Sequence, residues 1–506
     1  MARLLTWTLS ILWNGSTYNQ TTTDSARLIS ASGNYSLTPP GISSFGGRGM
    51  VSSATFTLAN HDGRYSADGD GAMAAYMANN GTYQMPISLV ASIGDGTSVQ
   101  LFSGVIKTVR EQSPTPTQTG IVTIDARTME DMYLNRRQST TVTAFAEMHD
   151  ESYTEADIMA RWLDDAGLTD GQYTIDPGLF RIPYAWLDDE SLVEECWLLA
   201  AACGGRFYGD ANGDLVYENA THWLKTPHTT VSTSEPDNAF TRDDFTGFEM
   251  WWDDTDLYKN VTVEYSGRAQ DAPDSVWEPE EDITVPADDS VSVTATFRQP
   301  AYSISGISYT AATVGGIDIT SDVTATFATQ NAQRAEVTFT NANTTYAARL
   351  HDVTISGVPI TGGPDGEVTA TSSDTFWTGR TPRDRSIRAN VYVQTRPHAA
   401  MIAAMLADVQ GKPRRMYKLS GVPGDPRRKV GDRISITDAQ TSTSVRYGYI
   451  VELGWSLSGG LFTNEITAID ANSLYEYADN EIGYFIIGTN ELGATVSYPS
   501  RGRLFY

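Results

Sequence analysis

The sequence has almost no cysteine, few basic residues and no long apolar run. Its 506 residues include two cysteines, Cys196 and Cys203, which excludes a small scaffold held together by disulfides. Both lie in one apolar run, and if that run is helical their Cα atoms are about 10 Å apart, too far for a bond. We expect two buried thiols in the core, and a redox or metal-binding pair remains the alternative.

Membrane-spanning segments are also missing, because no run approaches the roughly 18 apolar residues that a spanning helix needs. Apolar residues near the N-terminus alternate with Thr and Ser: Leu5, Trp7, Leu9, Ile11 and Trp13. This period of two is typical of a strand, and no small-residue cleavage site for a signal peptide follows. We therefore predict an N-terminal strand and no transmembrane segment.

Positive charge is scarce. The chain has 35 Lys and Arg against 62 Asp and Glu, a formal net charge of −27. Such a chain repels phosphates, so the charge disfavours sequence-specific binding of nucleic acid and binding to anionic membranes.

Catalytic signatures are missing as well. The six histidines are scattered, and no zinc-protease, paired-cysteine, Walker or nucleophile-elbow motif occurs. His149 lies in a polar triplet that we interpret as a loop. We predict no catalytic residue, no cofactor and no metal, and classify the chain as not an enzyme.

Two local features invite a functional interpretation. Residues 210–214 resemble a calcium loop but lack its full spacing and distal Glu, and the Asn212–Gly213 pair favours a type I′ hairpin turn between 206–209 and 215–218. The Trp251–Trp252 pair could hold a sugar. We favour packing in a core or interface for the pair, because it lies in a strand-like segment.

Short strands are what the sequence has in abundance. Thr-rich segments separated by turn residues are typical of a barrel or sandwich. The clearest candidates are residues 51–58, 87–93, 99–106 and 120–125, with a hairpin loop at 113–117. We therefore predict a mainly β fold with α+β insertions.

Helical signals are few. Apolar spacing predicts helices over residues 153–167, 191–203 and 398–409. Ser191 and Glu194 have the spacing of a capping box at the start of the second helix.

Charge is segregated along the chain. Residues 235–290 hold 17 Asp or Glu and three Lys or Arg, whereas residues 380–433 hold 13 Lys or Arg and four Asp. This segregation suggests that the protein has a basic surface with a function. The alternative is a set of exposed arginines paired with the acidic segment.

One stretch resembles a known family. Residues 54–66, Ala-Thr-Phe-Thr-Leu-Ala-Asn-His-Asp-Gly-Arg-Tyr-Ser, are similar to a segment of tailed-bacteriophage baseplate or tail-tip hub proteins, in which an apolar strand runs into an Asn-x-Asp-Gly-Arg-aromatic-Ser turn. Weaker similarities follow in the family's order at 101–106, 125–134, 163–167, 201–217, 340–341, 355–359 and 399–413. The resemblance rests on that order.

The resemblance implies a virion structural protein, a homotrimeric hub that joins the tail tube to the tip or spike and forms the channel for genome ejection. Each subunit would carry two tail-tube-like β-barrel domains, so that three subunits present a pseudo-sixfold ring to the tube. Implied partners are the tail-tube or distal-tail ring protein, the tape-measure protein, and a tip spike or fibre. The implied location is the tail tip or baseplate of the virion, after synthesis in the host cytoplasm. Some relatives carry a C-terminal peptidoglycan hydrolase or fibre that this chain lacks, so we expect a partner to cut the cell wall.

For such a multidomain hub we predict six segments along the chain. They are a first barrel (1–135), an α+β domain (136–230), an acidic strand segment returning to a barrel (231–275), a β-sandwich-like domain (276–375), a second barrel with a helix (376–474) and an aromatic C-terminal arm (475–506). The arm is too apolar for a solvated tail, and we expect it to dock on its own core or on a neighbouring subunit.

Electrostatics suggests which residues matter in such a hub. DNA must slide through a tail without sticking, and a carboxylate-lined bore repels phosphate. Channel-lining candidates come from the acidic segment: Asp253, Asp254 and Asp256. Arginine suits protein interfaces because its guanidinium pairs bidentately with carboxylates. The interface candidates are Arg414, Arg415, Arg427 and Arg428.

Two other functions remain open. A host-adhesion or carbohydrate-binding tail protein would be favoured by exposure of Trp251, Trp252 and Tyr258, and a peptidoglycan hydrolase is the third hypothesis.

Overall fold

Strands dominate the structure, a computed structural model that describes residues 5–12, 21–37, 47–66, 71, 74, 85–113, 120–128, 137–144, 153–388, 390–442 and 444–471. The α-helices in these residues are α1 (Thr21–Ala26), α4 (Glu155–Asp165), α5 (Leu192–Ala202) and α6 (Arg396–Val409). The predicted fold class, mainly β with α+β insertions, is confirmed. None of the helices in these ranges is long and apolar enough to cross a membrane.

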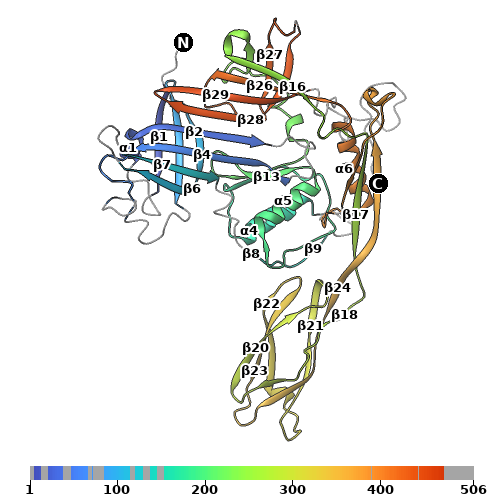
Figure 1. Cartoon of the computed structure of the whole chain (residues 1–506). Coiled ribbons are helices and arrows are strands. Elements are labelled where there is room, and N and C mark those ends of the chain that lie inside the picture. The colour runs from blue at the N-terminus through green and yellow to red at the C-terminus, as the bar shows by residue number, and fades with distance from the viewer. Residues whose placement is uncertain are drawn as a thin grey trace.

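A 12-stranded sheet contains strands from both ends of the chain (Figure 1). Its N-terminal strands, in spatial order, are β1 (Leu5–Ile11), β5 (Pro86–Ile93), β6 (Ser98–Gln112), β7 (Ile121–Thr128), β4 (Met50–Ala59) and β2 (Leu28–Leu37). The order continues with β28 (Arg446–Ser458), β29 (Leu461–Asp470), β26 (Arg414–Pro423) and β16 (Gly247–Asp253), while β27 (Arg433–Thr437) pairs with β28 and β15 (Ala239–Thr241) with β27. The predicted strands at 51–58, 87–93, 99–106 and 120–125 are confirmed.

The antiparallel pair β2–β28 joins the two halves of this sheet. Ser30 lies opposite Ser458 and Ser36 opposite Glu452, more than 400 residues away in the chain. Within the described residues no sheet closes on itself, so the two halves form one open, continuous sheet and the predicted β-barrels are not closed barrels.

One face of the sheet is apolar because its strands alternate. In β5, Ile87, Leu89 and Ala91 are completely buried, while the residues between them are partly exposed. Strand β1 buries Leu9 and Ile11 in the same core, as its period of two predicts. The residues of β1 and β5 that face the other way are mainly Thr and Ser.

An α+β unit packs beside the sheet. Its four-stranded sheet has the order β10 (Tyr173–Ile175), β14 (Leu215–Glu218), β13 (Arg206–Gly209) and β3 (Gly47–Arg48). Two short pairs accompany it, β11 (Tyr184–Ala185) with β9 (Thr143–Ala144) and β12 (Glu190–Ser191) with β8 (Arg137–Gln138). Helices α4, α5 and α6 confirm the three predicted helices.

The predicted capping box at α5 is wrong. Ser191 is the N-cap, but its side chain makes no capping hydrogen bond. Ser191 also ends β12 and has a ψ of 114°, whereas the capping box forms at α4, where Thr154 has a ψ of 171° and pairs with Asp157. The backbone of Ser191 is extended, as at other N-caps, and what is missing is the bond from its side chain.

The predicted hairpin at 206–218 is present, but its turn is not type I′. Gly213 has a φ of 92°, and Asn212 is not among the residues with positive φ, although a type I′ turn needs positive φ at both. The Asp210 carboxylate instead accepts the backbone N–H groups of Asn212 and Asp214, at 2.8 and 3.0 Å. These bonds hold the turn between the two strands.

A long arm extends away from the rest of the molecule (Figure 1). The six-stranded sheet that runs from beside α6 into this arm contains β17 (Asn260–Gln270), β18 (Asp274–Trp277), β19 (Ile283–Val285), β21 (Ala301–Ala312), β24 (Ala348–Thr371) and β25 (Asp384–Ile387). A three-stranded sheet, β20 (Asp289–Thr296), β23 (Arg334–Asn341) and β22 (Val323–Gln330), faces part of it. The arm has its own core, in which Val337, Phe339 and Leu350 are fully buried. The six-segment division of the chain stays a prediction.

Candidate functional site: a structured turn, a polar sheet face and four arginines

The turn at residues 60–66, which carries the family resemblance, is held by its own side chains. Buried Asn60 accepts the backbone N–H of Tyr65 at 2.9 Å and donates to Ser66 Oγ at 3.2 Å. Asn60 also donates to Glu111 Oε1 of β6 at 3.2 Å. Gly63 has a φ of 70°, which favours glycine. The residue pattern therefore specifies the turn and attaches it to β6.

The same turn fixes α1 against the sheet. Tyr65 donates its hydroxyl proton to buried Asp24 of α1 at 2.7 Å, and the Arg64 guanidinium lies 3.5 Å from the same carboxylate. Arg27 makes two hydrogen bonds to Asp62, at 2.5 and 2.7 Å, and this pairing lowers the pKa of Asp62. The sequence pattern could not identify Asp24, Arg27 or Glu111, because no local signal marks partners so distant in the chain.

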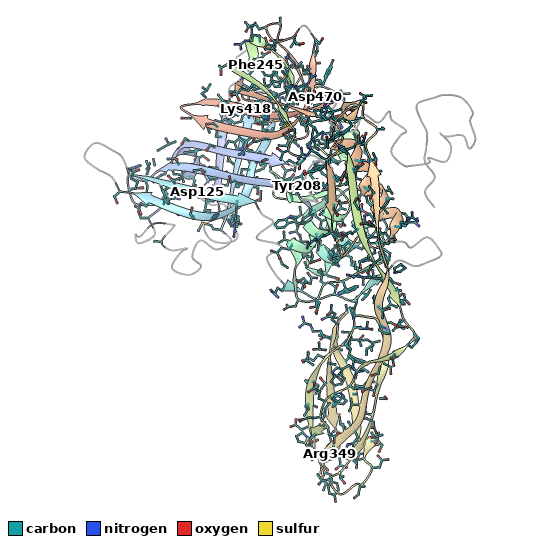
Figure 2. All side chains as sticks on the ribbon, turned by 45° about the vertical axis from the view of Figure 1, so that its right-hand side comes forward. Asp125, Tyr208, Phe245, Arg349, Lys418 and Asp470 are labelled. Carbon is teal, nitrogen blue, oxygen red and sulfur yellow. The ribbon has the colours of Figure 1, made fainter. Side chains whose placement is uncertain are left out.

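Rows of polar residues cross the non-core face of the large sheet. Residues directly opposite on neighbouring strands share a face. One row runs from β6 to β29 through Thr108, Asp125, Thr55, Ser32, Ser456 and Thr463. A second row runs from β2 to β16 through Ser36, Glu452, Thr467, Lys418 and Glu249. Figure 2 shows Asp125 and Lys418 on the two halves of the molecule that the sheet joins. This polar face is built by both ends of the chain.

The polar face is hollowed where the two halves meet. A depression of about 510 Å³ is lined by Gly33, Asn34, Lys418, Glu452, Gly454, Trp455, Ser456, Thr463, Glu465 and Thr467. Glu452 accepts hydrogen bonds from Asn34 at 2.9 Å and Thr467 at 3.1 Å, which tie β2, β28 and β29 together. A Cβ at Gly33 would lie 2.5 Å from the Trp455 ring, so glycine allows this close approach.

Arg427 and Arg428, two of the four arginines predicted to lie at a protein interface, form hydrogen bonds with residues of their own chain. Arg428 is 6% exposed and donates to Asn238, Asn464 and the carbonyl oxygens of Pro423 and Asp237. Burial lowers its pKa. Arg427 pairs with Asp425 at 2.8 Å and with Glu235 of the acidic segment, and these bonds raise its pKa.

The other two candidates lie at the start of β26. Arg414 is buried and donates to the carbonyl oxygen of Asp256 at 3.1 Å. Arg415 has a side chain that is 42% exposed, lies over the Trp252 ring at 4.5 Å and is 3.9 Å from Asp470. These contacts correspond to the alternative in which arginines pair with the acidic segment, and a role at an interface with another protein stays a prediction.

The channel candidates lie where β16 ends. Asp254 is exposed, and its carbonyl oxygen accepts a hydrogen bond from Arg383 at 2.9 Å. The Asp256 side chain is 39% exposed. The side chain of Asp253 lies outside the described part of the structure. Whether these carboxylates face a channel stays a prediction.

The two cysteines and the histidine His398 are buried in the protein core. Cys196 and Cys203 are fully buried and free, and burial raises both pKa values. His398 is buried and donates a hydrogen bond from Nε2 to the carbonyl oxygen of Ala202 at 2.8 Å, and burial lowers its pKa to about 4. In the described residues no cluster of His, Cys, Asp and Glu could hold a metal. His149, the 113–117 loop beyond Ser113 and the 475–506 arm lie outside those residues.

Comparisons with known proteins give similarity of structure only. No protein-family model and no curated protein matches the sequence. A 43 kDa tail protein of prophage MuSo2 from Shewanella oneidensis is 9% identical, with 93% of this chain and 100% of that chain covered and a TM-score of 0.47. A tail protein from Neisseria meningitidis is 8% identical, with coverages of 93% and 98% and a TM-score of 0.45. An Escherichia coli type VI secretion component, described as similar to bacteriophage T4 tail proteins, is 8% identical, with coverages of 89% and 76% and a TM-score of 0.37.

Proposed function

We propose that the chain is a non-enzymatic structural hub of a phage-type tail. Three copies form a ring that joins the tail tube to the tip or spike and encloses a channel for genome ejection. The observation that carries the proposal is the polar face of the 12-stranded sheet, to which both halves of the chain contribute. Three copies of a two-half sheet supply six similar segments around one axis, as a sixfold tube requires.

The chemistry of the polar face suits a surface along which DNA slides. Its hydroxyl groups carry no charge, Glu452 of β28 and Glu465 of β29 add carboxylates, and the cation Lys418 lies beside Glu249. A threefold ring repeats each carboxylate three times around the axis, so the repulsion of phosphate adds up in a narrow bore. We therefore place this face toward the channel.

We assign smaller roles in the hub to the acidic residues and to the arginines. Asp253, Asp254 and Asp256 add negative charge at one mouth of the channel. Arg415 is the most exposed of the four arginines and contacts a neighbouring protein, whereas Arg414, Arg427 and Arg428 make their contacts within the chain. The partners are the tail-tube or distal-tail ring protein, the tape-measure protein and a tip spike or fibre, at the tail tip of the virion.

Copy number in the particle tests the proposal. Purified tails, analysed by quantitative mass spectrometry against an isotope-labelled standard of this chain, should contain three copies per tail. A density map of the tail should show the polar face lining the bore. Absence from the particle, or a polar face turned outward, would reject the proposed function.

A carbohydrate-binding adhesion role is the second candidate, because Trp251 and Trp252 are 39% and 57% exposed. The Arg415 guanidinium occupies one face of the Trp252 ring, which leaves less of that ring for stacking on a sugar. A glycan array tests this candidate. The role requires a glycan that binds the wild-type protein and does not bind Trp251→Ala.

A further inference from the structure

Strand β16 has an edge to which no described strand is bonded. It pairs on one side with β26, over the seven positions from Gly247 to Asp253, and ends the 12-stranded sheet on the other. An open edge presents unpaired N–H and C=O groups and is a site for strand addition. Charged residues or prolines commonly protect such edges, but β16 carries Met250, Trp251 and Trp252 there.

These three side chains are exposed on both faces of the strand. Successive side chains of a strand point to opposite faces. Met250 and Trp252 share the face of Phe248, which packs in the core beneath the sheet, and Trp251 shares the polar face with Glu249. Met250, Trp251 and Trp252 are 43%, 39% and 57% exposed. A partner that covers them must be apolar on both of its own faces.

The chain beyond the described residues starts close to this edge. Strand β26 is antiparallel to both β29 and β16, and Met416 lies between Ile469 of β29 and Trp251 of β16. Strand β29 therefore ends at the same end of the sheet as β16. At about 4.8 Å per strand, a position beside β16 is about 14 Å from the end of β29. Ten residues, 472–481, easily cover that distance at about 3.3 Å each.

The sequence that follows has the required composition. Residues 482–487, Ile-Gly-Tyr-Phe-Ile-Ile, place Tyr484 and Ile486 on one face of a strand and Phe485 and Ile487 on the other. Residues 472–491 contain four acidic residues and no Lys or Arg. The exposed end of β26 carries the Arg415 guanidinium, so the charges are complementary as well.

We propose that residues 482–487 of the same chain add to the open edge of β16 as an antiparallel strand and cover Met250, Trp251 and Trp252. Residues 472–481 cross the end of β26 and β16 on the way, with their carboxylates near Arg415. The C-terminal segment thereby extends the sheet by one strand. This proposal does not depend on the proposed function, because it concerns the isolated chain.

Hydrogen exchange of the isolated full-length chain tests the added strand. The variant Ile486→Pro removes a backbone donor in the middle of the proposed strand, and Thr495→Pro is the matched control outside it. We expect amides of residues 247–253 to exchange about tenfold faster or more in Ile486→Pro than in wild type. The control variant and peptides of β1, at the opposite edge of the sheet, should be unchanged. Equal exchange of residues 247–253 in wild type and Ile486→Pro overturns the proposal.

Cysteine cross-linking identifies which copy supplies the strand. Trp251→Cys is combined with cysteine at each of positions 484 to 487 in turn, and the buried native Cys196 and Cys203 do not compete. A disulfide needs Cα atoms within about 7 Å, so at least one pair should oxidise rapidly in a mixture of 15N-labelled and unlabelled protein. Cross-linked peptides should be all heavy or all light. Mixed heavy–light peptides alone, or no cross-link at any position, overturn the proposal.

Discussion

Arg428 is a buried arginine that stabilises the fold, although the sequence suggested a surface charge. Its guanidinium is buried among four oxygen acceptors, two of them side-chain amides and two backbone carbonyls. Truncation leaves these acceptors without a donor, which is far more costly than losing an exposed ion pair.

We predict that Arg428→Ala lowers the free energy of unfolding by about 3 kcal/mol. Arg110→Ala, which removes a 70% exposed side chain paired with Asp125, should cost less than about 1 kcal/mol. Urea unfolding followed by circular dichroism compares the two. Equal losses would contradict a structural role for Arg428.

Glu155 gives the second prediction at this scale. Burial raises the pKa of its carboxyl to about 7, although its oxygens accept the N–H groups of Leu179 and Phe180 at 2.7 and 2.8 Å. The folded chain therefore holds this proton more tightly than the unfolded chain, and stability falls as pH rises from about 4.5 to 7. Relative to Glu155→Gln, wild type should lose about 1–3 kcal/mol between pH 4.5 and 7.5. Melting curves at both pH values measure the difference, and a difference of opposite sign would refute the assignment.

At the scale of elements, the pair β2–β28 holds the two halves of the sheet together, and Gly33 is its tightest point. A methyl group there would meet the Trp455 ring at 2.5 Å. Gly33→Ala should therefore displace the ring and lower the free energy of unfolding by about 1–3 kcal/mol. Ser32→Ala, a neighbour on the polar face, is the control and should change stability little. Thermal unfolding distinguishes the variants, and tolerance of both would show that the seam can adjust.

Local patterns predicted elements, whereas pairings between distant segments could not be predicted. The alternation of Leu9 and Ile11, and of Ile87, Leu89 and Ala91, correctly predicted strands because each apolar side chain enters one core. Nothing local in β2 or β28 indicates that they pair. The same reason explains the arginines: the sequence shows a basic segment, but only the fold brings Arg427 to Glu235 and Arg414 to Asp256. The capping box at Ser191 did not form, although Ser191 is the N-cap of α5, because residue spacing alone does not fix the direction in which a side chain bonds.

At the scale of the whole molecule, the polar face gives a prediction about DNA release. Glu452→Lys with Glu465→Lys places cations on the proposed channel wall, where they would attract phosphates. Particles should assemble normally but release DNA more slowly, with a defect that decreases as salt is added. Glu336→Lys, which changes an exposed side chain on β23 of the arm, is the control. Release rates measured by dye entry check this, and normal release by the double variant would argue against a channel at this face.

Strand β24 gives the molecule a mechanical property. Its residues 348–359 pair with β18, β19 and β21 in the arm, and its residues 360–371 pair with β17, which packs under α6. One covalent backbone therefore carries any load from the arm into the rest of the molecule without crossing a loop. Pulling on the arm, at whose far end Arg349 lies (Figure 2), loads the β17–β24 hydrogen bonds in shear, all at once. The arm is thus built to act as a stiff lever.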